Sequence, residues 1–350
     1  MKKELLALIV LLCSFLSCTQ SQNLDSYLKS LEEENKAMGN VFILKDGKQV
    51  YSKSIGFANM DLNKKNNIAT RFRIGSISKT FTATIILQLV KENKLSFDTP
   101  LSKYFSGITN SEKITISDML YHRSGIYNIT NDKNFEVWIS EPRKRKEMLD
   151  KIMSYQSLFV PNSKTEYSNS NYVLLAYIAE DVEGKMFEEI LKERIIDKLS
   201  LQETDFGKNI DFSKNEAMCY YPEGGKWHSI TFHTNLTGTM GAGGIISNAK
   251  DVSIFYNALF TGEFLSENMI KKMTAAQDEI GMGVSVVDFN GMTVYGHNGA
   301  IDGFRSAVAY FPKLKLTICL TFNASSGSST RKLIQVFKSY LITEQENNKY

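Results

Sequence analysis

The feature that most constrains the fold is an apolar helix that begins with a serine and carries a lysine on its first turn. The segment 72–81 reads FRIGSISKTF, and residues 81–90 are apolar on nearly every side of a helix. A helix of this composition lies at the centre of a domain, covered all round. If it begins near Ser76, the Ser76 hydroxyl lies at the positive end of the helix dipole, with Lys79 one turn further along the same face.

The Ser76 and Lys79 pair has two readings. Burial disfavours the charged ammonium, so the pKa of Lys79 should fall and its neutral amine could accept the proton of a nucleophilic serine. Burying a lysine with no purpose costs free energy. In the alternative reading, Ser76 only caps the helix and Lys79 extends to solvent. The bare Ser-x-x-Lys pattern does not decide, because it occurs three more times without such a helix after it.

Two other polar stretches stand beside apolar patterns. Tyr167-Ser168-Asn169 comes just before an apolar helix pattern, and segment 295–304 reads YGHNGAIDGF. A cation beside a tyrosine can lower the pKa of its phenol, so we expect the pKa of Tyr167 to be lowered if a cationic group lies beside it. The small residues of 295–304 allow another backbone to lie against a strand edge. The alternatives are a polar turn before a helix and a glycine-rich hairpin with an incidental histidine.

Together these stretches resemble the three motifs of the serine β-lactamase and penicillin-binding-protein superfamily. The resemblance is greatest to the class C β-lactamase-like branch, which holds D-alanyl-D-alanine carboxypeptidases, D-aminopeptidases and esterases. Segments 114–126 and 241–251 are similar to that branch in the same order. The resemblance implies an α/β plus all-α, serine β-lactamase-like (DD-peptidase) fold. Its antiparallel sheet is formed by both termini, with helices on its faces and an inserted helical subdomain.

The resemblance also implies a role for each motif residue. Ser76 would attack a carbonyl, Lys79 and Tyr167 would move protons, and His297 would orient or protonate the leaving group. The backbone N–H groups of Ser76 and Ala300 would form the oxyanion hole. The implied substrate-binding residues are Asn169, Asn298, Gly299 and Ala300. This chemistry needs no metal or cofactor.

The substrate is less constrained than the chemistry. His297 stands where class C β-lactamases prefer a lysine that helps to bind a substrate carboxylate, so efficient antibiotic hydrolysis is not expected. We expect a D-alanyl-D-alanine carboxypeptidase-like peptidase or related amidase acting on small molecules or peptides, peptidoglycan stem peptides included. A carboxylesterase, a weak β-lactamase and a non-catalytic binder of cell-wall peptides remain alternatives. The rival Ser-x-Asn sequences at 213–215 and 266–268 lack suitable flanks.

The apolar patterns suggest strands at both ends of the chain and helices between them. Such an order favours one sheet made from both termini with a helical insertion. We expect one domain over 24–345, with an α/β part at about 24–75 and 240–345 and a helical part at about 76–239. The predicted elements are a helix from Leu24 to about Met38, a hairpin over 41–51 around Asp46-Gly47, mostly helices over 101–235, strands at 284–287, 292–295, 306–310 and 315–321, and a helix over 329–341.

The N-terminal residues resemble an export signal. Lys2 and Lys3 precede an apolar run over 5–16 that is too short to span a bilayer comfortably. We expect a signal peptide over 1–17, lipidation of Cys18 and a linker over 18–23. The protein would then be an exported lipoprotein, attached to a membrane and facing the periplasm or cell surface. The alternative is ordinary signal cleavage near residues 17–21.

The remaining histidines, cysteines and charged residues give no sign of a second functional site. We expect His122 to be a buried structural histidine and Cys319 a small buried hydrophobe, with a bridge to Cys219 left open. The 41 basic and 38 acidic residues are mixed along the chain and give a net charge of +3, so no nucleic-acid partner is expected. Neither Gly-x-Ser-x-Gly nor His-Glu-x-x-His occurs.

Overall fold

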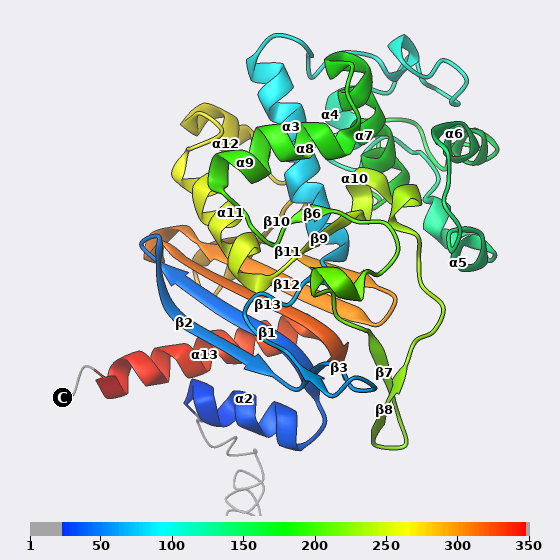
Figure 1. The fold of residues 1–350 in the computed structure, drawn as a ribbon. Helices are drawn as coiled ribbons and strands as arrows, with labels where there is room; N and C mark the ends of the chain where they lie inside the picture. Colours follow the sequence, from blue (N-terminus) through cyan, green and yellow to red (C-terminus); the bar gives the residue numbers. More distant parts are fainter. Residues whose placement is uncertain (1–22, 348–350) are drawn as a thin grey trace, which may run out of the picture.

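The computed structural model describes residues 23–347, which form a six-stranded antiparallel sheet with helices on both faces (Figure 1). The strand order is β10-β11-β12-β13-β1-β2, so the first two strands of the chain lie beside the last four. Val41 of β1 lies opposite Leu320 of β13, which confirms that both ends of the chain build one sheet. The strands are β1 (Ala37–Lys45), β2 (Lys48–Ile55), β10 (Ser285–Phe289), β11 (Met292–Ile301), β12 (Phe304–Phe311) and β13 (Leu316–Ser325).

The first hairpin confirms one sequence prediction, and the helix before it corrects another. Asp46 and Gly47 join β1 to β2 with φ of 50° and 72°, as a tight hairpin turn requires. The first helix, α2 (Leu24–Glu33), begins where predicted, but the predicted end near Met38 is wrong. The chain leaves the helix through Asn35, whose φ is 52°, and the apolar residues beyond it are buried strand residues of β1.

Helices from different parts of the chain cover the two faces. The helices α2 and α13 (Ser329–Asn347) pack on one face, around a core that includes Leu28, Phe322 and Phe337. The final helix predicted over 329–341 is therefore confirmed. On the other face lies α11 (Ala249–Thr261), whose Phe255 stacks on Phe81 of the central helix with ring centroids 3.7 Å apart.

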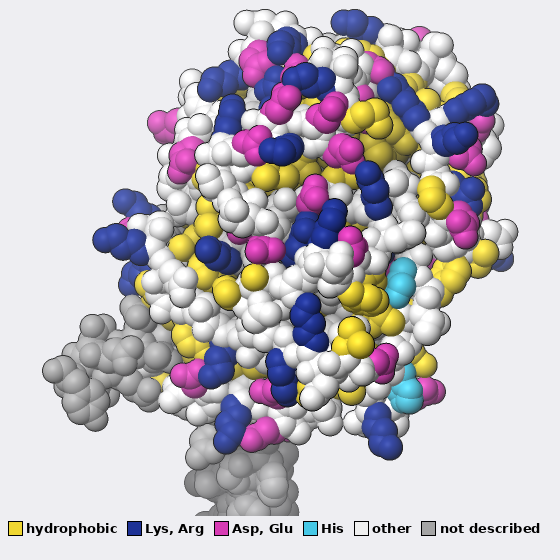
Figure 2. All heavy atoms as spheres, viewed as in Figure 1, with side chains coloured by type: hydrophobic (Ala, Val, Ile, Leu, Met, Phe, Trp, Pro, Cys, Tyr) yellow, Lys and Arg dark blue, Asp and Glu magenta, His cyan; other side chains and the backbone are white. Residues whose placement is uncertain are grey.

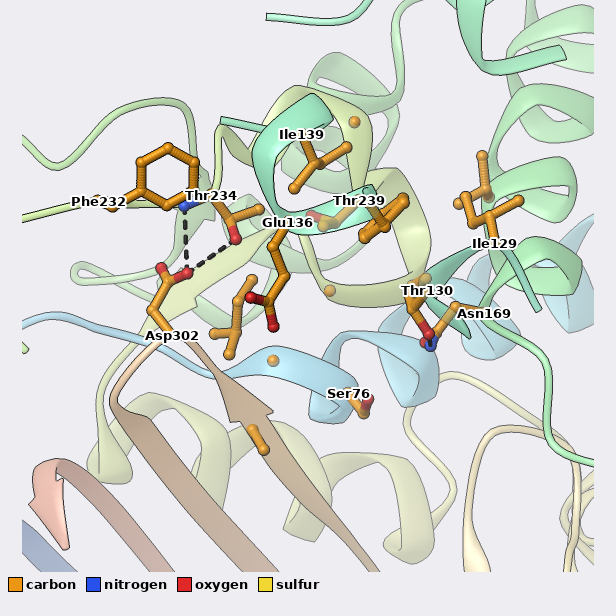
Figure 3. Close-up of a pocket in the computed structure, with 18 of the residues that line it drawn as sticks. Ser76, Ile129, Thr130, Glu136, Ile139, Asn169, Phe232, Thr234, Thr239 and Asp302 are labelled. Carbon is orange, nitrogen blue, oxygen red and sulfur yellow. Dashed lines mark hydrogen bonds between the residues drawn. The ribbon is translucent and has the colours of Figure 1, made fainter. Parts of the chain in front are cut away.

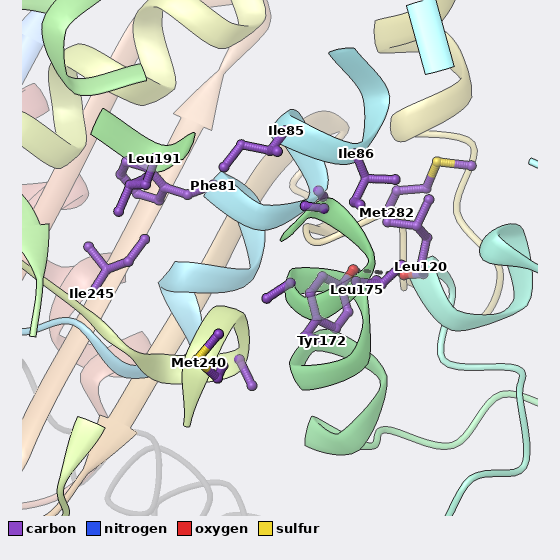
Figure 4. Close-up of a cluster of buried hydrophobic side chains, with 14 of the residues drawn as sticks. Phe81, Ile85, Ile86, Leu120, Tyr172, Leu175, Leu191, Met240, Ile245 and Met282 are labelled. Atoms are coloured by element: carbon purple, nitrogen blue, oxygen red, sulfur yellow. Dashed lines mark hydrogen bonds between the residues drawn. The ribbon is translucent and has the colours of Figure 1, made fainter. Parts of the chain in front are cut away.

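The central helix is α3 (Ser78–Lys91), entered through one 3-10 turn, η1 (Gly75–Ile77). Every residue from Ser78 to Leu89 is buried. In Figure 4, Ile86 of α3 lies on the side toward Leu175 of α7 (Asn169–Glu183), whereas Phe81 lies on another side of α3, beside Leu191. The prediction of a helix covered on all sides is confirmed.

Helices are the main regular elements in the middle of the chain, but loops take up more of it than predicted, and it contains short strands that were not predicted. Strands β7 (Tyr220–Glu223) and β8 (Lys226–Ser229) form a hairpin whose turn, Gly224-Gly225, has positive φ at both residues. Two glycines there favour a hairpin over a helix.

The remaining strands of the described residues are short. They are β3 (Phe57–Asn59), β4 (Lys64–Lys65), β5 (Phe72–Arg73), β6 (Asp205–Phe206) and β9 (Ile245–Ser247). The other helices are α4 (Ile116–Leu120), α5 (Phe135–Trp138), α6 (Arg145–Met153), α8 (Phe187–Leu191), α9 (Asp197–Leu199), α10 (Met240–Gly243) and α12 (Glu267–Met273).

The predicted signal peptide, Cys18 and most of the predicted linker lie outside the described residues. Across 23–347, no helix is both long and apolar enough to cross a membrane. Within the same range, no group of three or more His, Cys, Asp or Glu side chains is arranged to hold a metal ion. On the face drawn in Figure 2, basic and acidic side chains are interspersed.

Candidate active site

Ser76 and Lys79 meet at the start of the central helix, as their spacing predicts. Ser76 lies in the 3-10 turn and is partly exposed, whereas Lys79 is fully buried. Lys79 Nζ lies 3.1 Å from Ser76 Oγ, 2.7 Å from Asn169 Oδ1 and 2.7 Å from the backbone O of Ala242. Burial lowers the pKa of Lys79 well below its usual value. The alternative in which Lys79 extends to solvent is therefore wrong.

Tyr167 is the third member of this cluster. Its hydroxyl donates to Ser76 Oγ at 2.9 Å, and Lys79 Nζ lies 4.9 Å from the centre of its ring. The expected lowering of the pKa of Tyr167 is wrong, because burial raises that pKa and the hydrogen bond to Ser76 offsets the rise only in part. The residue is 37% exposed, yet its hydroxyl lies deep in the cluster. The lowered pKa of Lys79 agrees with the raised pKa of Tyr167, because a neutral Lys79 offers no cation to lower the pKa of the phenol.

Asn169 is held in place by side chains that the sequence did not single out. Its backbone N and side-chain Nδ2 both donate to Asn128 Oδ1, at 3.0 and 3.3 Å. Nδ2 also donates to Thr130 Oγ1 at 3.1 Å, which leaves Oδ1 to accept from Lys79. Asn128 and Thr130 lie in a polar loop, where nothing in the sequence separates a functional asparagine from a turn residue. Ala242 was missed because its contribution is a backbone carbonyl.

Strand β11 passes close beside the serine because glycines permit it. A Cβ on Gly75, whose φ is 53°, would lie 2.8 Å from the backbone N of Ala300. A Cβ on Gly299 would lie 1.9 Å from the backbone O of Ile74. These contacts bring the backbone of Ala300 next to that of Ser76, where two N–H groups can serve one oxyanion.

The close contact between Gly299 and the backbone of Ile74 leads to a prediction about stability. Replacing Gly299 by Ala should lower the free energy of unfolding by about 1–3 kcal/mol and reduce any activity, because the strand must move away from Ile74. Gly291 is the matched control: its φ is 77° but nothing lies within 4 Å of an added Cβ, so Gly291→Ala should cost only backbone strain, about 1 kcal/mol, and spare activity. Denaturant unfolding measures both. Equal losses in the two variants would contradict the close approach.

His297 and Asn298 lie side by side on β11 but are placed differently. By strand alternation His297 shares with Gly299 the sheet face toward Ser76. Burial lowers the pKa of His297 to about 4, so its ring is neutral at pH 7. Nδ1 lies 2.7 Å from the backbone O of Asn298, which leaves Nε2 as an acceptor. The side chain of Asn298 turns the other way and donates to Thr330 Oγ1 of α13, so the structure does not bring its side chain to Ser76.

The other candidate residues make no hydrogen bond with Ser76 or Lys79. His122 is buried, as predicted, and Cys219 and Cys319 are both buried and free, which closes the question of a bridge between them. In the rival Ser-x-Asn sequences, Ser213 donates to Asp211 Oδ1 in a 3-10 turn and Ser266 caps α12. Neither serine contacts Lys79.

A cavity of about 550 Å³ opens beside Ser76 (Figure 3). Asn169 lines the cavity, and so does Ala242, whose backbone O contacts Lys79. Ala300 also lines it. β10 pairs with β11 only as far as Gly296, so the part of β11 beyond it has no β10 neighbour. The serine therefore faces a space large enough for a small acyl compound or the end of a peptide.

The chain is similar over most of its length to known proteins of one family. The family described as Beta-lactamase matches residues 24–337. A putative penicillin-binding protein, PbpX of Bacillus subtilis, is 30% identical over 325 residues, which are 91% of this chain and 78% of that protein. A teichoic acid D-alanine hydrolase of Staphylococcus aureus is 30% identical over 202 residues, 57% of this chain but only 47% of that protein.

A likeness in three dimensions supports the same assignment. The structure of a D-amino acid amidase from Ochrobactrum anthropi SV3 superimposes with a TM-score of 0.80 at 21% identity, over 91% of this chain and 99% of that one. At this identity the likeness establishes the fold alone, and it confirms the serine β-lactamase-like architecture. The chain belongs to the Beta-lactamase family of serine hydrolases.

Proposed function

We propose that this protein is an exported serine hydrolase that cleaves D-aminoacyl amides or esters through an acyl-enzyme, as a D-alanyl-D-alanine carboxypeptidase-like peptidase or a related amidase. The observation that carries the proposal is the set of hydrogen bonds around Lys79. A neutral amine has two N–H donors and one lone pair. Asn169 Oδ1 and the O of Ala242, each 2.7 Å away, take the two donors, so the lone pair faces Ser76 Oγ. Tyr167 donates to the same oxygen and leaves the serine proton free to point at Lys79.

The proposed reaction follows from this arrangement. The Ser76 proton passes to Lys79 as Oγ attacks the carbonyl carbon, and the N–H groups of Ser76 and Ala300 hold the oxyanion. As the bond to the leaving group breaks, the proton on Lys79 returns through Tyr167 to the leaving nitrogen or oxygen. The neutral His297 orients that group from the strand side. Water then repeats the attack on the acyl-serine and releases the acid.

The choice of a D-aminoacyl substrate rests on the relatives. One similar protein is described as a teichoic acid D-alanine hydrolase, and a protein of the same fold as a D-amino acid amidase. Beyond Gly296, the edge of β11 opposite β12 has no β10 neighbour, and a short extended substrate could lie along that edge. Asn169, which already contacts Lys79, would bind the substrate amide from the opposite side.

A substrate panel tests the function directly. We expect purified residues 23–350 to hydrolyse D-alanine p-nitroanilide or a D-alanyl ester faster than nitrocefin, with D-Ala-D-Ala peptides and simple acyl esters as further arms. A fluorophosphonate probe should add its mass to the peptide that contains Ser76. If no substrate turns over and no probe labels the folded protein, the chain is a binder and the proposed function is wrong.

The proposal includes export and a lipid anchor at Cys18. The basic residues and apolar run before Cys18 are typical of an export signal, and the relatives named for teichoic acid and penicillin act on cell-envelope material. Replacing Cys18 by Ser should release the protein from the membrane fraction and leave the activity of the purified domain unchanged. Cell fractionation with immunoblotting measures this. A wild-type protein found in the soluble fraction would contradict the anchor but not the hydrolase.

A further inference from the structure

Many of the side chains that line the cavity beside Ser76 are apolar. The larger ones among them are Ile129, Phe135, Ile139, Val173, Ile230 and Phe232. Such walls suit a small apolar acyl side chain and weaken the screening of any charge that they surround. A charged group on the lining is therefore a strong candidate for selecting the substrate.

Three charged side chains reach the lining, and two of them are already bound. Asp302 Oδ2 lies 2.9 Å from the buried guanidinium of Arg73, and its Oδ1 accepts from the backbone N and hydroxyl of Thr234. Arg305 donates to two backbone carbonyl groups of its own turn. The carboxylate of Glu136 makes no hydrogen bond or ion pair with any other residue of 23–347. In Figure 3 it extends from α5 into the space between Asp302 and Ser76.

We propose that Glu136 binds the free α-ammonium group of the acyl part of the substrate. This inference rests on the proposed function and adds to it the chemical class of the acyl donor, an amino acid with an unblocked amine. A substrate that fills the cavity covers Glu136 and excludes water from it. The attraction between the carboxylate and the ammonium group is then stronger than that of an ion pair on an open surface. An N-acylated donor would leave the carboxylate buried without a partner, which disfavours its binding.

The test compares two substrates on two variants. We expect Glu136→Gln to lower kcat/KM for D-alanine p-nitroanilide by roughly 10- to 100-fold, in line with the loss of a charged hydrogen bond. For N-acetyl-D-alanine p-nitroanilide the same variant should keep or raise kcat/KM, because that substrate carries no ammonium group and the substitution removes the unpaired charge. Glu141→Gln is the matched control: this carboxylate is exposed five positions along the chain and does not line the cavity, so neither substrate should respond.

The outcomes separate this proposal from the proposed function. Equal losses for both substrates would overturn the ammonium site, and so would no loss for either. Labelling of Ser76 by an uncharged fluorophosphonate in Glu136→Gln shows in those cases that the hydrolase is intact. Failure of that labelling in the wild type would instead overturn the proposed function itself.

A second inference concerns His122 and rests on separate contacts. The backbone O of His122 accepts from Glu166 N at 2.9 Å, and its Nδ1 accepts from Ser168 N at 3.1 Å. Its ring stacks on Tyr167, with centroids 4.4 Å apart and planes at 30°. One residue thus holds both chain neighbours of Tyr167 and the face of its ring. Burial lowers the pKa of His122 well below its usual value, which keeps Nδ1 available as an acceptor.

We infer that His122 is a positioning residue that fixes the Tyr167 hydroxyl against Ser76. A shift of even about 1 Å in such a group can cost a large part of the rate. Asn128 and Thr130 do the same for Asn169 through its side chain, whereas His122 acts through the backbone on either side of the tyrosine.

A double-mutant cycle distinguishes positioning from general stability. His122→Phe keeps a stacking ring but loses the acceptor, so we expect kcat to fall about 10-fold with KM nearly unchanged. In a Tyr167→Phe background the same substitution should change kcat by less than about twofold, because its target is gone. Ser253→Ala, which removes a buried hydrogen bond to the backbone O of Ala249 within α11, is the control: it should lower thermal stability and spare kcat. Additive losses in the double variant would refute the positioning role.

Discussion

Replacing Ser76 by Ala should lower turnover by roughly 10⁴-fold or more, because no other group at the site can form the acyl intermediate. The variant should fold normally, since Ser76 is partly exposed and its oxygen serves only Lys79 and Tyr167. Initial rates on the best substrate of the panel measure the loss. Mass spectrometry should show that the fluorophosphonate adduct disappears with it.

Ser78 supplies the matched control for Ser76. It lies two residues further on and its hydroxyl accepts from the backbone N of Ile245 at 3.1 Å, inside the core. Ser78→Ala should cost about 1 kcal/mol of stability and keep both the adduct and the turnover. If Ser76→Ala retains turnover, or if Ser78→Ala loses the adduct while still folded, Ser76 is not the nucleophile.

Replacing Lys79 by Arg should lower kcat by roughly 100-fold or more, because a guanidinium stays protonated and cannot accept the serine proton. The sign of the pH dependence follows from the same requirement. Burial lowers the pKa of Lys79, so the active neutral form persists below the usual lysine range, and kcat/KM should fall as pH drops through that lowered pKa.

Two readouts keep the Lys79 prediction falsifiable if the larger side chain disturbs the core. Circular dichroism and thermal unfolding report the fold of Lys79→Arg, and Lys79→Met offers an uncharged side chain of similar length. Both variants should lose turnover while folded. Activity near the wild-type level in either of them, or a kcat/KM that rises as pH falls, would remove Lys79 from the base role.

The sequence predicted the centre of the site because its residues lie next to regular elements. Ser76 and Lys79 stand on one helical turn, and Tyr167 and Asn169 stand at the start of the next buried helix, so local spacing carries the information. Asn128 and Glu136 could not be found in the same way. Asn128 precedes a single 3-10 turn and Glu136 lies in the four-residue helix α5, so neither belongs to a long periodic element, and their importance depends on which distant element packs against them.

Two sequence predictions were wrong because tertiary packing decides them: the pKa of Tyr167 and the end of the first helix. The pKa of Tyr167 was expected to fall because a lysine was near, but burial neutralises that lysine and raises the pKa of the phenol. The helix from Leu24 was extended too far because the apolar residues of a buried strand continue its pattern beyond Asn35. Which of two effects prevails depends on packing, and packing is not local in sequence.

The pairing of β1 with β13 has a consequence for when the enzyme can first work. Ala37–Lys45 is made early in synthesis, yet its partner Leu316–Ser325 is among the last segments to be made. Until then β1 has no neighbour on that side, and Gly299 and Ala300 have not been made when the serine helix has. Non-local pairing of this kind slows folding and delays it to the finished chain. An incomplete chain would therefore carry the proposed nucleophile without its proposed oxyanion strand, and we expect hydrolysis to begin only once the whole sheet has closed.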